Sequence, residues 1–300
     1  MSKIEKLQEK IDNIYENNEG IFNNRYILVE KINEGGMGIV YKIKDVYNEY
    51  FNDYKELVIK IPHKDLLKKK DIGALFYSEY KCLREMNHKH IIKTYDFGIE
   101  EEIKIPYIIL EYLDGIPLDQ MTLFNMTRDE KVSLFKTLIS TIQYIHNNEI
   151  IHGDITPQNI MLSNKNKITF FDFGISQSAK SRTSISFDFN NSKAFNPKYS
   201  APEILNGETP SMHSDMFSLA LILYEIFSLE LPFKLDSTEL KNKPVTKTNC
   251  SKKIPLFLRQ WFINILKTNP KKRRQTLPII YKLLMFRNAV VDNSKVYLYK

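Results

Sequence analysis

IHGDITPQNIMLSNKNKITFFDFG, which occupies residues 151–174, is the stretch that decides the fold of this 300-residue chain. Two apolar, strand-like runs flank polar loops, and the loops carry the oxygen-bearing side chains of Asp154, Asn159 and Asp172. Carboxylate and amide oxygens are suitable ligands for a hard cation such as magnesium with bound phosphates. Asp and Asn are also common turn formers, so each residue alone has a second interpretation. Their spacing within one short stretch favours a shared metal and phosphate site.

The same stretch resembles the catalytic and metal-binding core of the protein kinases. The resemblance implies that Asp154 accepts or orients the proton of the acceptor hydroxyl, and that Asn159 and Asp172 hold magnesium. It also implies an α+β, bilobal protein-kinase fold, with a small antiparallel β-sheet lobe carrying one helix and a larger, mainly helical lobe. The expected boundaries are a helical extension at 1–24, a kinase domain at 25–290 with lobes at about 25–112 and 113–290, and a tail at 291–300.

The composition is that of an ordinary soluble globular protein, with 43% hydrophobic and 26% charged residues. The net charge of +7 is modest, and without a concentrated basic patch it does not predict a nucleic-acid partner. The two cysteines, Cys82 and Cys250, indicate neither a disulfide framework nor a zinc site. No apolar run reaches the roughly 18 residues of a membrane span, and the N-terminus lacks a signal-peptide core. We therefore expect a cytoplasmic protein, although the sequence leaves delivery into another cell open.

A glycine-rich turn, INEGGMGIV at 32–40, lies between two strand-like runs. Missing side chains let backbone N–H groups approach phosphate closely. The kinase pattern Gly-x-Gly-x-x-Gly-x-Val is met here by Asn33, Gly35, Gly38 and Val40. Asn replaces the first glycine, and Asn tolerates a positive φ better than most residues.

The strand-like run LVIKI at 57–61 alternates, so that Lys60 is expected on the face opposite Leu57, Ile59 and Ile61. A helix is predicted over 71–86, and its spacing turns Glu79 inward with the apolar residues. A carboxylate on a buried face needs a cationic partner. We expect Lys60 to be that partner, and the resemblance implies that the pair aims the ammonium at the α- and β-phosphates of ATP. Two independently solvated charges are the alternative.

The resemblance also extends to the nucleotide-binding residues. YIILEYLDG at 107–115 resembles the edge strand and hinge of a kinase, where backbone atoms meet the adenine. Met161, two residues after Asn159, would form the floor beneath the adenine. The full expected ATP set is Ile32, Asn33, Gly35, Gly36, Gly38, Val40, Val58, Lys60, Leu110, Glu111, Leu113 and Met161.

The second half of the chain is expected to be helical. Thr127 and Glu130 form a capping box that opens a helix with an apolar stripe at Val132, Phe135, Ile139, Ile142 and Ile145. A further helix from His213 is apolar nearly all round, and two more are predicted at 255–267 and 276–288. The resemblance implies that Asp215 binds the backbone of the catalytic loop, although an acidic residue there also complements the helix dipole. It further implies that Arg273 pairs with Glu203 of the Ala-Pro-Glu triplet.

Residues 1–24 carry Ile4, Leu7, Ile11 and Ile14 at helical spacing. One interpretation is a helix that packs on its own small lobe. The other is a short dimerising coil, for which two heptads are fewer than a coiled coil normally needs. Dimerisation therefore stays open at this point.

Three residues depart from the kinase pattern. Gly153 stands where many kinases carry an arginine that receives a phosphate from the activation segment. Thr156 replaces the lysine that normally touches the transferring phosphate, and Asn196 replaces the threonine that commonly partners that lysine. The polar segment at 175–200 offers Ser181, Thr183, Ser184 and Ser186 as candidate modification sites, although serine-rich loops are often simply flexible. Because Gly153 has no charge, we expect activity without phosphorylation of this segment.

The resemblance covers roughly residues 26–288 and is closest to the bacterial-type serine/threonine protein kinases. It implies transfer of the γ-phosphoryl group of ATP to a protein hydroxyl, with Mg²⁺ as cofactor and protein substrates as partners. Two alternatives remain. The chain could be a pseudokinase acting as a nucleotide-dependent scaffold, in keeping with Thr156, or a small-molecule kinase, whose His-Gly-Asp spelling it shares. The intact Lys60, Glu79 and Asp154 disfavour the first, and the activation segment disfavours the second.

Overall fold

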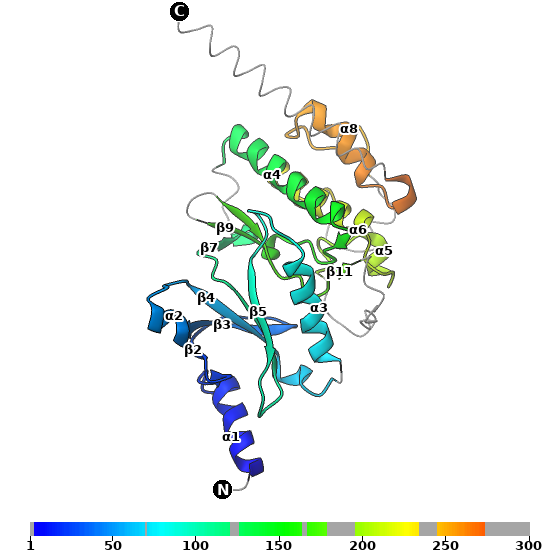
Figure 1. Ribbon diagram of the computed structural model, residues 1–300. Helices are drawn as coiled ribbons and strands as arrows, with labels where there is room; N and C mark the ends of the chain where they lie inside the picture. Colours follow the sequence, from blue (N-terminus) through cyan, green and yellow to red (C-terminus); the bar gives the residue numbers. More distant parts are fainter. Residues whose placement is uncertain are drawn as a thin grey trace, which may run out of the picture. The chain divides into compact units, whose positions relative to one another are not determined.

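The computed structural model describes residues 3–69, 71–120, 126–163, 167–178, 196–233 and 245–273 (Figure 1). The chain divides into two compact units. Among the described residues, unit 1 comprises those up to Gly115 together with Phe171–Gln177, and unit 2 comprises the rest. Most of the activation segment, the helix expected at 276–288 and the tail at 291–300 lie outside the described residues.

Unit 1 is built on a six-stranded antiparallel sheet with the strand order β1-β2-β3-β4-β6-β5. The small antiparallel sheet lobe predicted from the sequence is therefore confirmed. The strands are β1 (Ile21–Phe22), β2 (Tyr26–Glu34), β3 (Gly38–Asp45), β4 (Leu57–Pro62), β5 (Thr94–Ile99) and β6 (Pro106–Glu111).

Strand β4 lies inside the sheet, between β3 and β6, and all six of its residues are buried. Leu57, Ile59 and Ile61 pack into one hydrophobic cluster, as their alternation predicts. The side chain of Lys60 belongs to the opposite face, where α3 (Ile72–Arg84) supplies Glu79. The helix predicted over 71–86 is therefore confirmed, and it packs against β5 and β6.

The C-terminal end of helix α1 (Lys3–Tyr15) packs on the sheet of unit 1 (Figure 1). Ile14 has no exposed surface and joins the cluster formed by the apolar face of β4. The Tyr15 hydroxyl donates to the carbonyl of Pro62 at 2.8 Å, and the Tyr41 hydroxyl donates to the carbonyl of Ile14 at 3.0 Å. The interpretation of residues 1–24 as a helix packed on its own lobe agrees with these contacts.

A short helix, α2 (Val46–Phe51), connects β3 to the segment before β4 and was not predicted. Asp45 caps it by accepting a hydrogen bond from the backbone N–H of Tyr47. Six residues are too few to show a helical period in sequence, which explains why the pattern gave no signal. Unit 1 also contains the 3-10 helix η1 (Lys64–Leu66).

Unit 2 is mainly helical, as predicted. Its helices are α4 (Arg128–Asn147), α5 (Pro202–Leu205), α6 (Met212–Ser228), α8 (Leu256–Ile265) and the 3-10 helices η2 (Leu118–Gln120), η4 (Pro157–Asn159) and η5 (Pro270–Lys272). The strands β9 (Ile160–Ser163) and β10 (Ile168–Phe170) form a small sheet with β7 (Gly115–Pro117). The first residue of β7, Gly115, belongs to unit 1. The remaining strands are β8 (Ile150–Ile151) and β11 (Gln177–Ser178).

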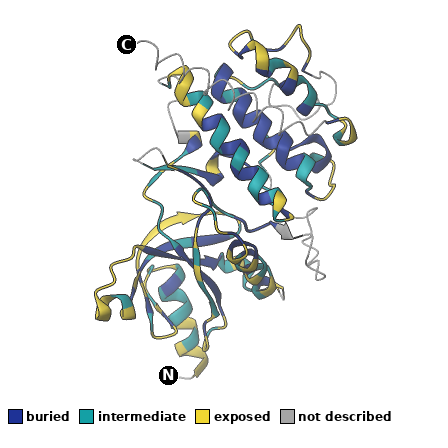
Figure 2. Ribbon diagram, turned by 45° about the horizontal axis from the view of Figure 1, so that its top comes forward, coloured by how far each residue is buried: buried dark blue, intermediate teal, exposed yellow. Residues whose placement is uncertain are grey.

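Two helices fix the core of unit 2. Thr127 and Glu130 close the predicted capping box at the start of α4. Phe135, Ile139, Ile142 and Ile145 of the predicted stripe are fully buried, whereas Val132 is half-buried. Helix α6 is buried on nearly every side, from Ser214 to Ser228 with the exception of Glu225 (Figure 2). No helix among the described residues is both long and apolar enough to cross a membrane.

We predict that Ile14→Ala lowers the free energy of unfolding by about 2–5 kcal/mol, because it leaves a cavity beneath β4. Urea denaturation of the full chain measures this. Ile4→Ala on the same helix is the matched control, since the Ile4 side chain is 79% exposed. The control should change stability by less than about 0.5 kcal/mol. Equal effects of the two substitutions would contradict the packing of α1 on the sheet.

Candidate active site

Unit 1 contains a buried cluster of one ammonium and two carboxylates, which we call the lysine cluster: Lys60, Glu79 and Asp172. The Lys60 Nζ lies 2.8 and 2.9 Å from the two Glu79 oxygens and 2.7 Å from Oδ1 of Asp172. Lys60 and Glu79 are only 6% and 3% exposed, whereas the Asp172 side chain is 38% exposed. Strand β4, helix α3 and the Asp-Phe-Gly segment therefore supply one charged group each, and the pairing of Lys60 with Glu79 agrees with the expectation from sequence.

Electrostatics hold Lys60 in its charged form. Burial alone would lower the pKa of this ammonium, but the neighbouring carboxylates of Asp172 and Glu79 outweigh burial and raise its pKa above the ordinary value. Burial raises the pKa of the Glu79 carboxyl, and the ammonium of Lys60 opposes that shift. Lys60 therefore stays protonated, and its ammonium is held in one place between the carboxylates of Glu79 and Asp172.

The Asp-Phe-Gly segment is shaped to reach this cluster. Asp172 has a φ of 59°, in the left-handed region that few non-glycine residues adopt. The backbone of Phe173 donates a hydrogen bond to Glu79. A Cβ on Gly174 would lie 3.3 Å from Oδ1 of Asp172 and 3.4 Å from Nζ of Lys60. The glycine thus lets the backbone pass close to the three charged groups.

The glycine-rich turn lies at the end of the same sheet, between β2 and β3. The backbone groups of Gly35 and Gly38 bond each other across the turn, at 2.9 and 3.2 Å. A Cβ on Gly38 would collide with the carbonyl oxygen of Ile61, so the close approach of β3 to β4 requires glycine there. Asn33 does not use the positive φ that asparagine tolerates, because it belongs to β2 and pairs with Val40 in the ladder.

The strand register brings several of the expected nucleotide-binding residues of unit 1 together. Val40 of β3 pairs with Lys60, and Leu110 of β6 pairs with Val58. Val58 and Leu110 are buried, whereas Val40 and the hinge residues Glu111 and Leu113 are half-buried. Ile32 and Asn33 of β2 and the turn residues Gly35 and Gly36 are exposed. Met161 belongs to unit 2, where it is half-buried on β9.

Unit 2 contains the second group of expected site residues, which we call the loop pair: Asp154 and Asn159. The Asn159 amide Nδ2 donates to the backbone carbonyl of Asp154 at 2.9 Å and to its Oδ2 at 2.8 Å. Asn159 ends the 3-10 helix η4 and is 8% exposed. Oδ1, the only oxygen of the Asn159 side chain, takes no part in these two hydrogen bonds.

The backbone before Asp154 is held by one carboxylate. Asp215 of α6 accepts hydrogen bonds from the backbone N–H groups of His152 and Gly153, both at 2.9 Å, and contacts Nε2 of His146 at 3.0 Å. The expectation for Asp215 is therefore confirmed. Gly153 has a φ of 84°, a conformation that an L side chain rarely adopts. This backbone geometry gives a physical reason for glycine at 153.

The end of the activation segment is anchored inside unit 2. Arg273 donates to Glu203 from Nη2 at 2.7 Å, and its Nη1 contacts the other oxygen. Both residues are buried, and the expected pair is confirmed. A second anchor, in which the Tyr199 hydroxyl donates to Glu225 at 2.6 Å, has no local pattern that predicts it. Asn196, one of the three departures, lies 3.4 Å from Oε1 of Gln158 through its Nδ2.

Comparison with known proteins identifies the family. A sequence model of the protein kinase domain matches residues 26–284. The chain is 30% identical over 215 residues to the serine/threonine-protein kinase PrkC of Bacillus subtilis. This match covers 71% of this chain and 32% of PrkC. It is 28% identical over 262 residues to the serine/threonine-protein kinase PknB of Mycobacterium leprae, and 28% identical over 263 residues to PknB of Mycobacterium tuberculosis. Each PknB match covers 84% of this chain and 41% of the relative.

The chain therefore belongs to the protein kinase family, and it is similar to the bacterial serine/threonine kinases. It spans about a third to two fifths of the length of these relatives. The family membership, together with the antiparallel sheet of unit 1 and the helices of unit 2, confirms the protein-kinase fold predicted from sequence.

We predict that Arg273→Ala lowers the free energy of unfolding by about 3–5 kcal/mol, because it leaves the buried Glu203 carboxylate without its cation. Thermal or urea denaturation measures the loss. Lys271→Ala, two residues away at an exposed position, is the control and should change stability by less than about 0.5 kcal/mol. An Arg273 variant as stable as the control would show that the pair does not anchor this segment.

Proposed function

We propose that this chain is an ATP-dependent protein kinase that transfers the γ-phosphoryl group to serine or threonine hydroxyls of protein substrates. One observation carries the proposal: a buried Lys60 ammonium held by both oxygens of Glu79 and by Asp172. A fully buried ion pair of this kind is costly to fold, so its presence calls for a purpose. In a kinase that purpose is to present a fixed positive charge to the phosphates of ATP.

The lysine cluster would bind and orient ATP. Glu79 keeps the Lys60 ammonium in place, so that little reorganisation is needed when phosphate arrives. Val40, Val58 and Leu110, with the hinge residues Glu111 and Leu113, would bind the adenine on the apolar side. Gly35, Gly36 and Gly38, with Ile32 and Asn33, would cover the phosphates through backbone N–H groups. Met161 of unit 2 completes the proposed adenine set.

The loop pair would act on the protein substrate. Asp154 accepts or orients the proton of the attacking serine or threonine hydroxyl. The hydrogen bonds from Asn159 hold the Asp154 carboxylate, and Asp215 holds the backbone before it. Both supporting residues are buried, Asp215 in the helix α6 and Asn159 in the 3-10 helix η4. We propose that the loop pair and the lysine cluster serve the same ATP molecule.

The residues present fit a divalent cation, and we propose Mg²⁺. Magnesium in proteins is typically bound by one or two carboxylates together with substrate phosphates, not by an all-protein cage. Asp172 offers a half-exposed carboxylate and Asn159 offers Oδ1. The ion would neutralise charge on the phosphates during transfer. Among the described residues, no group of three or more His, Cys, Asp or Glu side chains could hold a metal alone, so phosphate oxygens are needed to complete the site.

The alternatives have less support. A nucleotide-dependent scaffold would not need Asp154, yet Asn159 holds that carboxylate in place. A small-molecule kinase would not need the buried Glu203–Arg273 pair, which anchors a segment that protein kinases use to bind protein substrates. Thr156 removes one positive charge near the transferring phosphate and should slow the reaction without abolishing it.

We predict that Lys60→Ala and Asp154→Asn each lower the rate of phosphoryl transfer by at least about a hundredfold, because each removes a group that acts on the transition state. Transfer of radiolabel from ATP to a generic basic protein measures the rate. Lys42→Ala, a change at a half-exposed lysine on the neighbouring strand β3, is the matched control and should retain the activity. Undiminished transfer by either site variant would refute the proposed roles.

We predict that replacing Ser181, Thr183, Ser184 and Ser186 together by Ala preserves phosphoryl transfer, since Gly153 supplies no cation to receive a phosphate from this segment. The same assay measures it. A variant with Asp at the four positions is the comparison and should be no more active. Loss of activity with Ala and recovery with Asp would show that the segment is activated by phosphorylation.

A further inference from the structure

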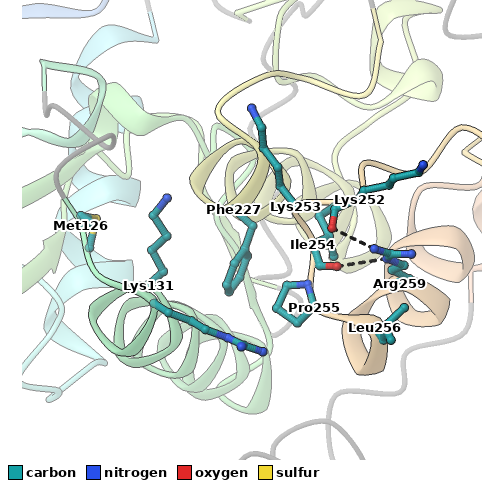
Figure 3. A pocket seen from close by; sticks show the side chains of 10 residues that line it. Met126, Lys131, Phe227, Lys252, Lys253, Ile254, Pro255, Leu256 and Arg259 are labelled. Carbon is teal, nitrogen blue, oxygen red and sulfur yellow. Dashed lines mark hydrogen bonds between the residues drawn. The ribbon is translucent and has the colours of Figure 1, made fainter.

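Unit 2 contains a pocket with five cationic side chains, which we call the basic pocket. Its cavity volume is about 440 Å³. No Asp or Glu is among the ten residues that line it, all of them in the described part of the chain. The lining residues are Met126, Arg128, Lys131, Phe227, Lys252, Lys253, Ile254, Pro255, Leu256 and Arg259 (Figure 3).

Two of the five cations have structural partners. The Arg259 guanidinium donates to the carbonyls of Ile254 at 3.0 Å and Lys252 at 2.9 Å, which shapes the turn before α8. The Lys253 ammonium donates at 3.0 Å to the carbonyl of Ser228, the last residue of α6. These contacts are to neutral carbonyls, so neither positive charge is neutralised by them.

The other three cations have no such explanation. Within the described residues, Arg128, Lys131 and Lys252 form no ion pair with a carboxylate. Arg128 and Lys131 also lie in the first turn of α4, at the positive end of the helix dipole, where a cation is unfavourable. The nearby Glu130 is already used, because Thr127 donates to it from its backbone N–H at 2.7 Å and from its hydroxyl at 2.8 Å.

The cations also repel one another. Lys131 projects from α4 on one wall, and Lys253 projects from the opposite wall, with Phe227 between them (Figure 3). Burial and the positive charge of Lys253 lower the pKa of Lys131. An anion between the two walls would relieve this repulsion. The first turn of α8 adds to the positive field, since no side chain caps it.

The remaining lining is apolar and partly open to solvent. Phe227, Ile254 and Pro255 are buried, whereas the Leu256 side chain is 77% exposed. A cavity of this volume falls within the range of about 300–1,000 Å³ that is usual for small ligands, so it exceeds the needs of a single inorganic ion. The combination suits an anionic group attached to an apolar neighbour.

We propose that the basic pocket binds a phosphorylated protein segment, with the phosphate between Lys131 and Lys253 and an adjacent apolar side chain against Phe227 and Leu256. The choice of phosphoserine or phosphothreonine as the ligand rests on the proposed function, because the proposed reaction produces these groups. Lysine and arginine form strong charge-assisted hydrogen bonds with phosphate. The pocket would therefore retain a product of the kinase, or a substrate that already carries a phosphate.

Fluorescence polarisation with the full chain tests the proposal without ATP or metal. The probe is a fluorescein-labelled pentapeptide of glycine and leucine with a central phosphothreonine, measured beside its unphosphorylated twin. We expect the phosphorylated probe alone to bind. Lys131→Glu should weaken its binding by about tenfold or more, which is the loss expected for one charge-assisted contact. Arg128→Gln should also weaken it, because this change removes one positive charge from the lining of the basic pocket. Lys136→Glu, on the same helix outside the pocket, is the matched control and should bind as the unaltered chain does.

Three results would overturn the proposal. Equal binding of the two peptides would show that phosphate is not recognised. If inorganic phosphate displaces the phosphorylated peptide and binds with the same affinity as that peptide, the pocket is a site for the free ion. Binding of the Lys131 and Arg128 variants at the strength of the Lys136 control would place the peptide elsewhere. An Asp154→Asn chain should still bind the probe, so a failed kinase assay and a failed binding assay remain distinguishable. Circular dichroism of each variant confirms that it is folded.

Discussion

The buried ammonium of Lys60 is the constraint on which the rest of unit 1 depends. A charge removed from water is tolerated only with close partners of opposite sign, and here two carboxylates lie within 2.9 Å of one nitrogen. Those carboxylates come from α3 and from the Asp-Phe-Gly segment, which are distant in sequence from β4. Forming the cluster therefore fixes the positions of β4, α3 and the Asp-Phe-Gly segment together. If one of these elements moved, a charged group would lose its partner or become exposed to water.

The remaining features of unit 1 support that cluster. Strand β4 is hydrogen-bonded on both sides, and its apolar face rests on a cluster that includes Ile14 of α1. The Tyr15 hydroxyl holds the carbonyl of Pro62, two residues beyond Lys60. Unit 2 also depends on a buried charged group, which is a carboxylate instead of an ammonium. The Asp215 carboxylate, 2% exposed, holds the backbone on which Asp154 is mounted. Each unit thus contains a buried ionic group that fixes the elements on which the proposed site residues lie.

Much of the arrangement of the two units could be predicted from the sequence, because local patterns of residues indicate which side chains share a face of a strand or helix. Alternation placed Lys60 opposite the apolar residues of β4, helical spacing turned Glu79 inward, and the capping box marked the start of α4. The Glu203–Arg273 pair followed from family resemblance alone, since no local pattern relates residues 70 positions apart.

Other features could not be read in this way. Helix α2 is too short to show a period, and the contact of Tyr15 with Pro62 depends on the tertiary fold. The conformation of Asn33 was decided by its ladder partner Val40 and not by its own propensity. The basic pocket collects residues from α4, α6, α8 and the segment before α8, so its charge appears in the sequence only as scattered lysines and arginines. Gly153 looked like the loss of an arginine, whereas the backbone conformation at this position favours glycine.

We have proposed that Asp172 of the lysine cluster and Asn159 of the loop pair both contribute to the binding of magnesium and ATP. Calorimetric titration of ATP with and without Mg²⁺ tests it most directly, using Asp172→Ala in unit 1, Asn159→Ala in unit 2, and the double variant. Our account predicts that each single substitution removes the gain in affinity that magnesium provides, and that the double variant loses no more than either, as expected for residues that act as a unit. Full retention of the magnesium-dependent gain in either single variant, or independent and additive losses, would contradict it.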